Sequence, residues 1–140
     1  MNVLFIGGTG KVSLRCVECA LEAGHKVTVF NRGQRDEALP AGVETIVGDM
    51  QNRASYSRLG DRNWDVVAQF IVFTPDQMQQ DIEVFAGRTG QYIFISSASV
   101  YKRSIFEYVT TEAHTAVENP YWPYSQAKIA CEALMKRSDL

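Results

Sequence analysis

Short apolar runs alternate with amphipathic stretches along the whole chain. The runs are rich in β-branched and aromatic residues, and they predict strands at residues 2–6, 27–30, 43–47, 64–73 and 91–95. Stretches with apolar residues at helical spacing predict helices at residues 11–23, 54–59, 75–86 and 123–137. Residues 100–121 show no clear period, so we expect a loop there.

Strands that alternate with helices predict an α/β fold, a doubly wound Rossmann-like parallel sheet of about five strands. We expect the strand order 3-2-1-4-5 in the sheet. In such a sheet, ligands bind outside the carboxyl ends of the strands. That rule gathers one set of candidate residues along a single edge: Gly7, Thr9, Gly10, Lys11, Val12, Asn31, Arg32, Asp49, Phe70, Ser96 and Ser97.

A glycine-rich turn, Gly7 to Gly10, separates the first predicted strand from the first helix. Glycine allows a tight turn and the close approach of a ligand, and the start of a helix presents free N–H groups and a positive dipole end. Strand, turn and helix come in the order that a dinucleotide site requires, so we expect this turn to bind phosphate. An ordinary βα turn is the alternative. The third small position is Ser13 rather than glycine, and serine can still permit close packing of helix on strand.

The end of the second strand bears on the choice of dinucleotide. A carboxylate there would favour the free ribose hydroxyls of NAD, whereas the chain has Asn31, Arg32 and, further on, Arg35. Arginine favours a phosphate at this position. We therefore expect NADP rather than NAD, with a solvated loop as the alternative for the two arginines.

Composition places the chain among ordinary soluble proteins, with 46% hydrophobic residues, 21% charged residues and a net charge of −2. We expect one domain over residues 1–140. No apolar run is long enough to span a membrane, and Met1 leads directly into the first strand, so we expect a cytoplasmic protein without a membrane partner. The basic residues are scattered, which argues against nucleic acid as a partner.

Two cysteines, Cys16 and Cys19, form a C-x-x-C that could indicate a redox or metal site. Both fall in the first predicted helix among apolar neighbours, and no second pair with metal spacing exists. With Cys131 the count is odd, so we expect three free thiols and no metal.

A tyrosine and a lysine four residues apart, Tyr124 and Lys128, lie in the last predicted helix. Residues at this spacing share one helix face. A free tyrosine titrates at about pH 10, and a nearby cation stabilises the phenolate. The pair can therefore transfer protons, although the spacing also arises by chance and needs the other motifs to support it.

Four motifs occur in order along the whole chain: Gly7-Gly8-Thr9-Gly10, Gly48-Asp49-Met50, Ser96-Ser97-Ala98-Ser99-Val100-Tyr101, and Tyr124-x-x-x-Lys128. Together they resemble the short-chain dehydrogenase/reductase superfamily. The fifth-strand motif and Phe30-Asn31-Arg32-Gly33 are similar to its extended branch, the NAD(P)-dependent epimerases, dehydratases and reductases that act on nucleotide sugars and related substrates.

The resemblance implies roles for individual residues. Tyr124 would exchange a proton with the substrate oxygen, Ser97 or alternatively Ser99 would hydrogen-bond that oxygen, and Lys128 would lower the tyrosine pKa and hold the nicotinamide ribose. Asp49 would contact the adenine amino group and Met50 would pack on the ring, although Asp49 can equally be a turn residue. The family's additional asparagine has no counterpart here, where the chain has Gln77, Gln79, Gln80 and Asp81.

Members of the extended branch are roughly twice this size and carry a small carboxyl-terminal substrate domain. The resemblance therefore implies an amino-terminal half that ends before a sixth strand, with the substrate domain absent. A fifth strand without its neighbour exposes an apolar edge, so we expect self-association into a homo-oligomer. We expect hydride transfer at a hydroxyl or carbonyl carbon of a small-molecule substrate, and the alternative is a non-catalytic NAD(P)-binding scaffold or sensor that binds protein or RNA.

Overall fold

A parallel sheet forms the centre of the molecule. The structure, a computed structural model, describes residues 1–34, 39–102, 109, 111–113 and 115–140. Within these residues the strands are β1 (Asn2–Ile6), β2 (Lys26–Asn31), β3 (Glu44–Val47), β4 (Trp64–Gln69) and β5 (Thr89–Phe94). All pairs are parallel and the order is β3-β2-β1-β4-β5. The predicted doubly wound α/β fold and strand order are confirmed.

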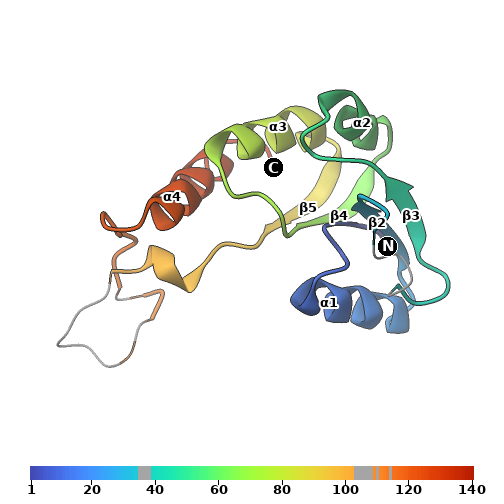
Figure 1. The fold of residues 1–140 in the computed structure, drawn as a ribbon, viewed down its shortest axis with the longest axis horizontal. Helices are drawn as coiled ribbons and strands as arrows, with labels where there is room; N and C mark the ends of the chain where they lie inside the picture. Colours follow the sequence, from blue (N-terminus) through green and yellow to red (C-terminus); the bar gives the residue numbers. More distant parts are fainter. Residues whose placement is uncertain (35–38, 103–108, 110, 114) are drawn as a thin grey trace.

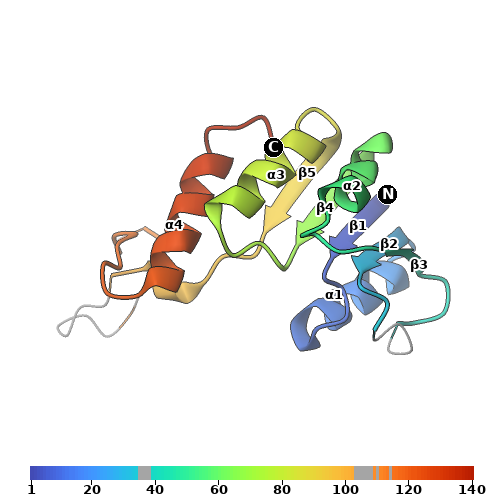
Figure 2. The same ribbon diagram turned by 45° about the horizontal axis from the view of Figure 1, so that its top comes forward.

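Helices cover both faces of the sheet. Helix α1 (Lys11–Glu22) lies on one face, while α2 (Arg53–Ser57), α3 (Pro75–Phe85) and α4 (Pro123–Met135) lie on the other (Figure 1; Figure 2). Successive side chains of a strand point to opposite faces, and β1 follows this rule. Val3 and Phe5 join the core under α1, whereas Leu4 and Ile6 join the larger core under the other helices.

The capping residues explain where α3 begins. The Thr74 Oγ1 accepts the Gln77 main-chain N–H at 3.4 Å, and the Gln77 Oε1 accepts the Thr74 N–H at 3.1 Å. This reciprocal pair satisfies N–H groups that have no partner within the helix, and Pro75 suits the first turn because it lacks an N–H. Gln77 is thereby fixed at the start of α3, beside the carboxyl end of β4.

The fourth strand is shorter than the sequence predicts. The apolar run indicates a strand to residue 73, but β4 ends at Gln69. The Gln69 Oε1 accepts the main-chain N–H of Ile71 at 2.8 Å, so a side chain replaces the strand partner at this point. The prediction for residues 70–73 is wrong, because apolar residues here leave the sheet and turn toward α3.

The segment between β5 and α4, predicted as a loop, contains local structure in its described part. A short 3₁₀ helix, η3 (Ala98–Val100), follows β5, and Tyr101 forms an antiparallel bridge with Val117. A second 3₁₀ helix, η2 (Arg58–Asp61), continues α2. The bridge brings residues 117–122 back beside the end of β5.

Strand β5 presents one apolar face to solvent. Tyr92 and Phe94 pack in the core under α3 and α4, while Ile93 and Ile95 are 39% and 38% exposed. In the described part of the chain, β5 is the outermost strand of the sheet on this side. Its outer edge and the face on the side of α1 are therefore open.

Candidate functional site

The glycine turn after β1 has a shape that side chains would disrupt. Gly7 has φ of 85°, a left-handed conformation that other residues rarely adopt. A Cβ on Gly7 would lie 2.5 Å from the Ile71 Cγ2, and a Cβ on Gly8 would lie 2.9 Å from both methyl groups of Val29. The turn therefore requires glycine at Gly7 for its conformation and at Gly8 for close approach of α1 to the sheet.

Ser13 has a larger part in this turn than the sequence indicated. Its side chain is buried, and its Oγ donates to the Gly7 carbonyl at 2.7 Å and accepts the Gly10 N–H at 2.9 Å. Gly10 is the N-cap of α1 and has an ordinary negative φ of −80°. Serine at this third small position therefore closes the turn with hydrogen bonds rather than merely tolerating close packing.

A cavity of about 530 Å³ opens at the carboxyl edge of the sheet, beside this turn. It brings together predicted cofactor residues from three separate segments. These are Gly7, Thr9, Gly10, Asn31, Arg32, Asp49 and Met50. The remaining lining residues were not among the predicted site residues, although Phe30 and Gly48 belong to two of the quoted motifs: Phe30, Gln34, Gly48, Gln51, Ile71, Phe73 and Gln77.

The ends of β2 and β3 form the far wall of the cavity. The Asn31 Oδ1 accepts the Gly33 N–H at 2.6 Å, and the Asp49 Oδ1 accepts the Gln51 N–H at 2.9 Å, so both side chains stabilise local turns. Gly48 leaves room for the core, because a Cβ there would lie 2.5 Å from the Phe30 ring. The Gly48-Asp49-Met50 motif pointed to this position, although only Asp49 and Met50 were predicted as site residues.

The remaining residues of this wall differ in exposure. Arg32 is exposed, whereas Met50 is 4% exposed and its side chain belongs to the core. The Met50 carbonyl accepts a hydrogen bond from the Gln80 side chain of α3 at 3.0 Å. Arg35, which contributed to the expectation of NADP, lies outside the described residues.

Three predicted cofactor residues lie beside the cavity rather than in its lining. Lys11 and Val12 are the first residues of α1, and both are exposed. Phe70 packs on the α1 side, where its ring stacks on Phe5 with centroids 6.3 Å apart. The structure places Ile71 and Phe73, the next residues along, at the cavity instead.

Lys128 points into the protein. Its side chain is 1% exposed, and its Nζ donates to the carbonyls of Val72 at 2.6 Å and Ile95 at 2.8 Å. The ammonium also lies 4.8 Å from the ring centroid of Phe73 and 4.5 Å from that of Phe94. Burial lowers the pKa of Lys128 below that of a free lysine. The side chain thus joins the segments that follow β4 and β5.

Tyr124 lies on the same face of α4, one turn before Lys128. The Lys128 Nζ is 5.9 Å from the centre of the Tyr124 ring, as expected for the i, i+4 spacing. The ring also packs against Trp122, with centroids 5.0 Å apart. The tyrosine is half-buried, so its ring is held while part of the side chain faces solvent.

The serines after β5 form hydrogen bonds with one another and with α4. The Ser97 and Ser99 hydroxyl oxygens are 2.8 Å apart, and the Ser125 hydroxyl donates to the Ser99 Oγ at 2.8 Å. The Ser96 hydroxyl donates to a carboxylate oxygen of Glu132. Ser97 and Ser99, the two alternatives for the family's serine, are thus hydrogen-bonded to each other.

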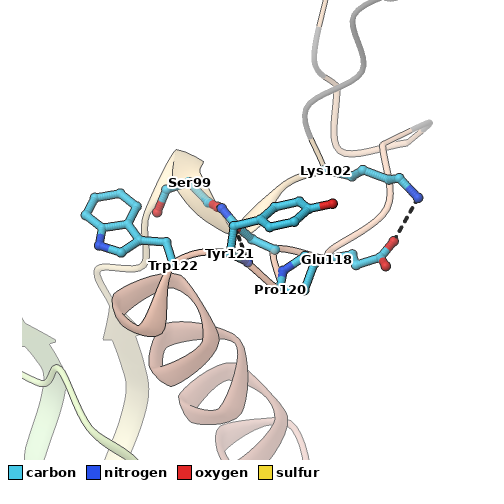
Figure 3. Close-up of a pocket in the computed structure, with 7 residues that line it drawn as sticks. Ser99, Lys102, Glu118, Pro120, Tyr121 and Trp122 are labelled. Carbon is cyan, nitrogen blue, oxygen red and sulfur yellow. Dashed lines mark hydrogen bonds and ion pairs between the residues drawn. The ribbon is translucent and has the colours of Figure 1, made fainter.

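A second cavity, of about 480 Å³, lies beside these serines at the start of α4 (Figure 3). Figure 3 shows the Tyr121 and Trp122 rings extending in different directions from the start of the helix, with Lys102 and Glu118 beyond Tyr121. Lys102 and Glu118 form an ion pair of 3.0 Å, and Tyr121 is 93% exposed. Ser99 is among the lining residues and Ser97 is not, and the exposed rings of Tyr121 and Trp122 give this cavity apolar walls.

A buried carboxyl lies beneath α3. Asp81 is fully buried and accepts hydrogen bonds from the hydroxyls of Tyr56 and Tyr92 and from the Gln69 amide. Loss of hydration raises the pKa of Asp81 to about 6, although the three hydrogen bonds oppose the rise. The carboxyl joins α2, α3, β4 and β5 in the core. Among the glutamine and aspartate residues of this stretch, Gln77 reaches the first cavity and Asp81 does not.

The C-x-x-C lies on the surface of α1, where Cys16 and Cys19 are exposed, while Cys131 is buried. In the described ranges, no group of three or more His, Cys, Asp or Glu side chains has an arrangement that could hold a metal ion. None of the helices that the structure describes is long and apolar enough to cross a bilayer.

Solved structures share this fold. An epimerase, Mth375, from Methanothermobacter thermautotrophicus superposes with a TM-score of 0.81 at 16% identity, over 97% of this chain and 46% of its own. The enzyme WbmH from Bordetella bronchiseptica, solved with NAD⁺, gives 0.80 at 20% identity, over 99% and 52%. A dTDP-glucose 4,6-dehydratase from Bacillus anthracis, solved with NAD, gives 0.72 at 17% identity, over 96% and 49%.

This chain spans about half the length of the structural relatives that it matches. A search of curated proteins finds no match. The sequence profile of a family described as NAD(P)H-binding matches residues 7–140, which include the glycine turn, all of the cavity lining and α4. The structural relatives are epimerases and dehydratases, as the four motifs implied, and the chain belongs to the NAD(P)H-binding family.

Proposed function

We propose that this chain forms the cofactor half of an NAD(P)-dependent oxidoreductase, epimerase or dehydratase. The observation that carries the proposal is the cavity in which the glycine turn meets the ends of β2 and β3. A Cβ on Gly7 or Gly8 would collide with Ile71 or Val29, so close packing on the two glycines fixes the shape of the turn. A dinucleotide fits this arrangement, because its phosphates can approach the turn and the start of α1.

The adenosine half of the dinucleotide would lie at the carboxyl ends of β2 and β3. Asn31 and Arg32 would contact the adenosine ribose, and Asp49 and Met50 would contact the adenine. Thr9, Gly10, Lys11 and Val12 surround the start of α1, where the phosphates would bind. Phe70 would support this site by its packing on Phe5, just before the chain turns into the cavity lining.

The chemistry would take place beside α4 and the end of β5. A bound nicotinamide supplies hydride transfer at a hydroxyl or carbonyl carbon. Tyr124 would give a proton to the substrate oxygen or take one from it, and Ser97 would hydrogen-bond that oxygen. The Lys128 ammonium lies 5.9 Å from the centre of the Tyr124 ring and is the nearby cation of this proposal. A nucleotide sugar or a related compound is the substrate class that we propose.

We further propose that NADP is preferred to NAD. Arg32 is exposed at the cavity, at the end of β2, where a 2′-phosphate would lie. Titration with NADPH and NADH, followed by fluorescence, tests both proposals. Arg32→Ala should weaken NADPH binding about tenfold and leave NADH binding unchanged, because a charge-assisted hydrogen bond to the 2′-phosphate is lost. Arg137→Ala removes an exposed arginine outside the cavity and is the matched control.

Two results would count against these proposals. Failure of the purified chain to bind either dinucleotide would reject the cofactor site. An equal loss of affinity for NADPH and for NADH in Arg32→Ala would reject the NADP preference while retaining the cofactor site.

A non-catalytic NAD(P)-binding scaffold or sensor is the second candidate. The observation that favours it is the Lys128 ammonium, which is bonded to two main-chain carbonyls. Tyr124→Phe in the protein that carries this segment separates the two candidates. Loss of turnover with retained dinucleotide binding supports the enzyme, and unchanged biological function supports the scaffold.

We also propose that copies of this chain associate through β5. Its outer edge is unpaired in the described residues, and Ile93 and Ile95 are exposed beside it. Unpaired strand edges and exposed apolar side chains favour association. Sedimentation velocity of Ile93→Lys tests this proposal, since the charge should shift the chain toward the monomer. An unchanged distribution would exclude β5 as the contact.

A further inference from the structure

The serine cluster after β5 continues to a side chain whose hydrogen-bonding direction is fixed. Asn119 has an amide with one acceptor atom and one donor group. The Tyr121 N–H can only donate, and it contacts the Asn119 Oδ1 at 3.2 Å. The Ser99 carbonyl can only accept, and it contacts the Asn119 Nδ2 at 2.8 Å. These two main-chain groups set the orientation of the amide.

The orientation of Asn119 determines the direction of the next hydrogen bond. Its Nδ2 also lies 3.4 Å from the Ser125 Oγ, so the Ser125 oxygen is an acceptor on that side. Ser125 is fully buried, and its hydroxyl proton is directed at the Ser99 Oγ, 2.8 Å away. A hydroxyl has one proton, so Ser125 has none left for another acceptor.

The same accounting applies to the next two hydroxyls. The Ser99 Oγ accepts from Ser125, so its own proton can bridge the 2.8 Å to the Ser97 Oγ. The Ser97 oxygen also accepts the Ser99 main-chain N–H at 3.2 Å. When Ser99 is the donor of this pair, Ser97 makes both inward contacts as an acceptor and keeps its own proton for an outward partner.

We propose that Asn119 and Ser125 are positioning residues that direct a chain of donors from Asn119 through Ser125 and Ser99 to Ser97. This series of hydrogen bonds makes Ser97 a donor toward the substrate oxygen and selects Ser97, rather than Ser99, as the serine that contacts it. The inference rests on the proposed function, because only a substrate oxygen gives this outward proton a role. It adds two residues, Asn119 and Ser125, to the Ser, Tyr and Lys of the proposed site.

The donor-to-acceptor direction of these hydrogen bonds can be measured without cofactor or substrate. In a 1:1 mixture of H₂O and D₂O, the Cβ resonance of a serine divides into two when its hydroxyl exchanges slowly. We expect divided Cβ resonances for Ser125 and Ser99, whose hydroxyl protons are held in hydrogen bonds to the next serine. We expect a single resonance for Ser97, whose hydroxyl proton faces outward. A divided Ser97 resonance, or single resonances for Ser125 and Ser99, would overturn the proposal.

The variant Asn119→Asp tests whether Asn119 sets the direction. A carboxylate only accepts, so the Ser125 proton should turn toward it and the following protons should reverse. The Ser97 resonance should then divide, and unchanged resonances would overturn the role of Asn119. Asn63→Asp places the same charge at an exposed asparagine and is the matched control. If the Asn119 variant does not fold, the serine resonances of the unsubstituted protein still decide the direction of the hydrogen bonds. Because no dinucleotide is present, failure here is distinct from failure of NAD(P)H binding.

Discussion

The two ends of this chain build their parts of the candidate site in different ways. Around β1 and α1, the site depends on backbone shape, since Ile71 and Val29 pack so closely on Gly7 and Gly8 that a Cβ would collide with them. Around β5 and α4, the site depends on polar side chains that bond one another or main-chain carbonyls, as Ser125 and Lys128 do. The first region holds its shape by close packing on glycine, and the second holds its polar groups by satisfying their hydrogen bonds.

This difference decides how each region responds to substitution. In the first region, an added methyl group removes space and strains the turn, so fold and binding change together. In the second region, a removed polar atom leaves partners without a hydrogen bond, which costs stability in proportion to burial. An exposed reactive atom in the same region can change with little effect on the fold.

The largest effect should come from Gly7→Ala. The substitution places a Cβ at φ of 85° and 2.5 Å from the Ile71 Cγ2, and we expect a loss of about 3 kcal/mol of stability with loss of NADPH binding. Gly24→Ala is the matched control, because Gly24 has φ of 78° and no atom within 4 Å of the added Cβ. It should cost about 1 kcal/mol. Equal losses in urea denaturation would show that space in the turn is unimportant.

The buried carboxyl in the core between the two regions predicts a pH dependence of stability. The folded pKa of Asp81 is about 6, above its ordinary 3.8, so the folded chain holds this proton more tightly. The contribution of this proton to the free energy of unfolding is about 3 kcal/mol in total. It is fully present below pH 3.8 and is lost as pH rises through about 6.

Urea denaturation of the chain and of Asp81→Asn, between pH 4 and 7, measures this contribution. The difference in unfolding free energy between the two should shrink by most of this total, about 2 kcal/mol, as pH rises over this range, because asparagine does not ionise. The exposed Asp76→Asn serves as the control and should show no such fall. A constant difference between the chain and the Asp81 variant would reject the raised pKa.

Removal of the buried ammonium should have the next effect. Lys128→Met leaves the carbonyls of Val72 and Ile95 without their donor, and relief of burying a charge offsets part of the loss, so we expect about 2 kcal/mol. Lys136→Met, at the exposed lysine that follows the last residue of α4, should change stability by less than about 0.5 kcal/mol. Similar values for both variants in thermal unfolding would contradict the inward position of Lys128.

The smallest effect should come from Tyr124→Phe. The described contacts of Tyr124 are made by its ring, with Trp122 and with Lys128, and phenylalanine keeps that ring. We expect a stability change within about 0.5 kcal/mol and NADPH affinity within about twofold. A larger loss of stability would mean that the Tyr124 hydroxyl has a structural partner. It would contradict the statement that an exposed reactive atom of this region can change with little effect on the fold.

Regular patterns in the sequence were enough to predict the strand order and the position of the glycine turn. The strands and the turn follow from local signals, which are apolar runs of strand length and glycines between a strand and a helix. The order of the strands follows from the doubly wound topology that their alternation with helices predicts. The inward position of Lys128 could not be predicted, because its acceptors at Val72 and Ile95 are distant in sequence and are main-chain atoms. Main-chain atoms carry no sequence signal.

The end of β4 and the role of Ser13 show the same limitation. Gln69 ends the strand by bonding the Ile71 N–H, although apolar residues continue to Phe73. Ser13 was expected to fit a tight contact, but its hydroxyl also bonds Gly7 and Gly10. In each case a polar side chain and a nearby backbone group decide the outcome, and hydrophobic periodicity does not report on such a contact.

Burial of the Lys128 ammonium also gives the protein a built-in chemical reporter. The other lysines of the chain, Lys11, Lys26, Lys102 and Lys136, are exposed, whereas Lys128 is 1% exposed. An amine-reactive ester should acylate the exposed lysines at once and reach Lys128 only when α4 separates from the ends of β4 and β5. The acylation rate at this one amine, read by mass spectrometry, therefore reports how often that part of the protein opens.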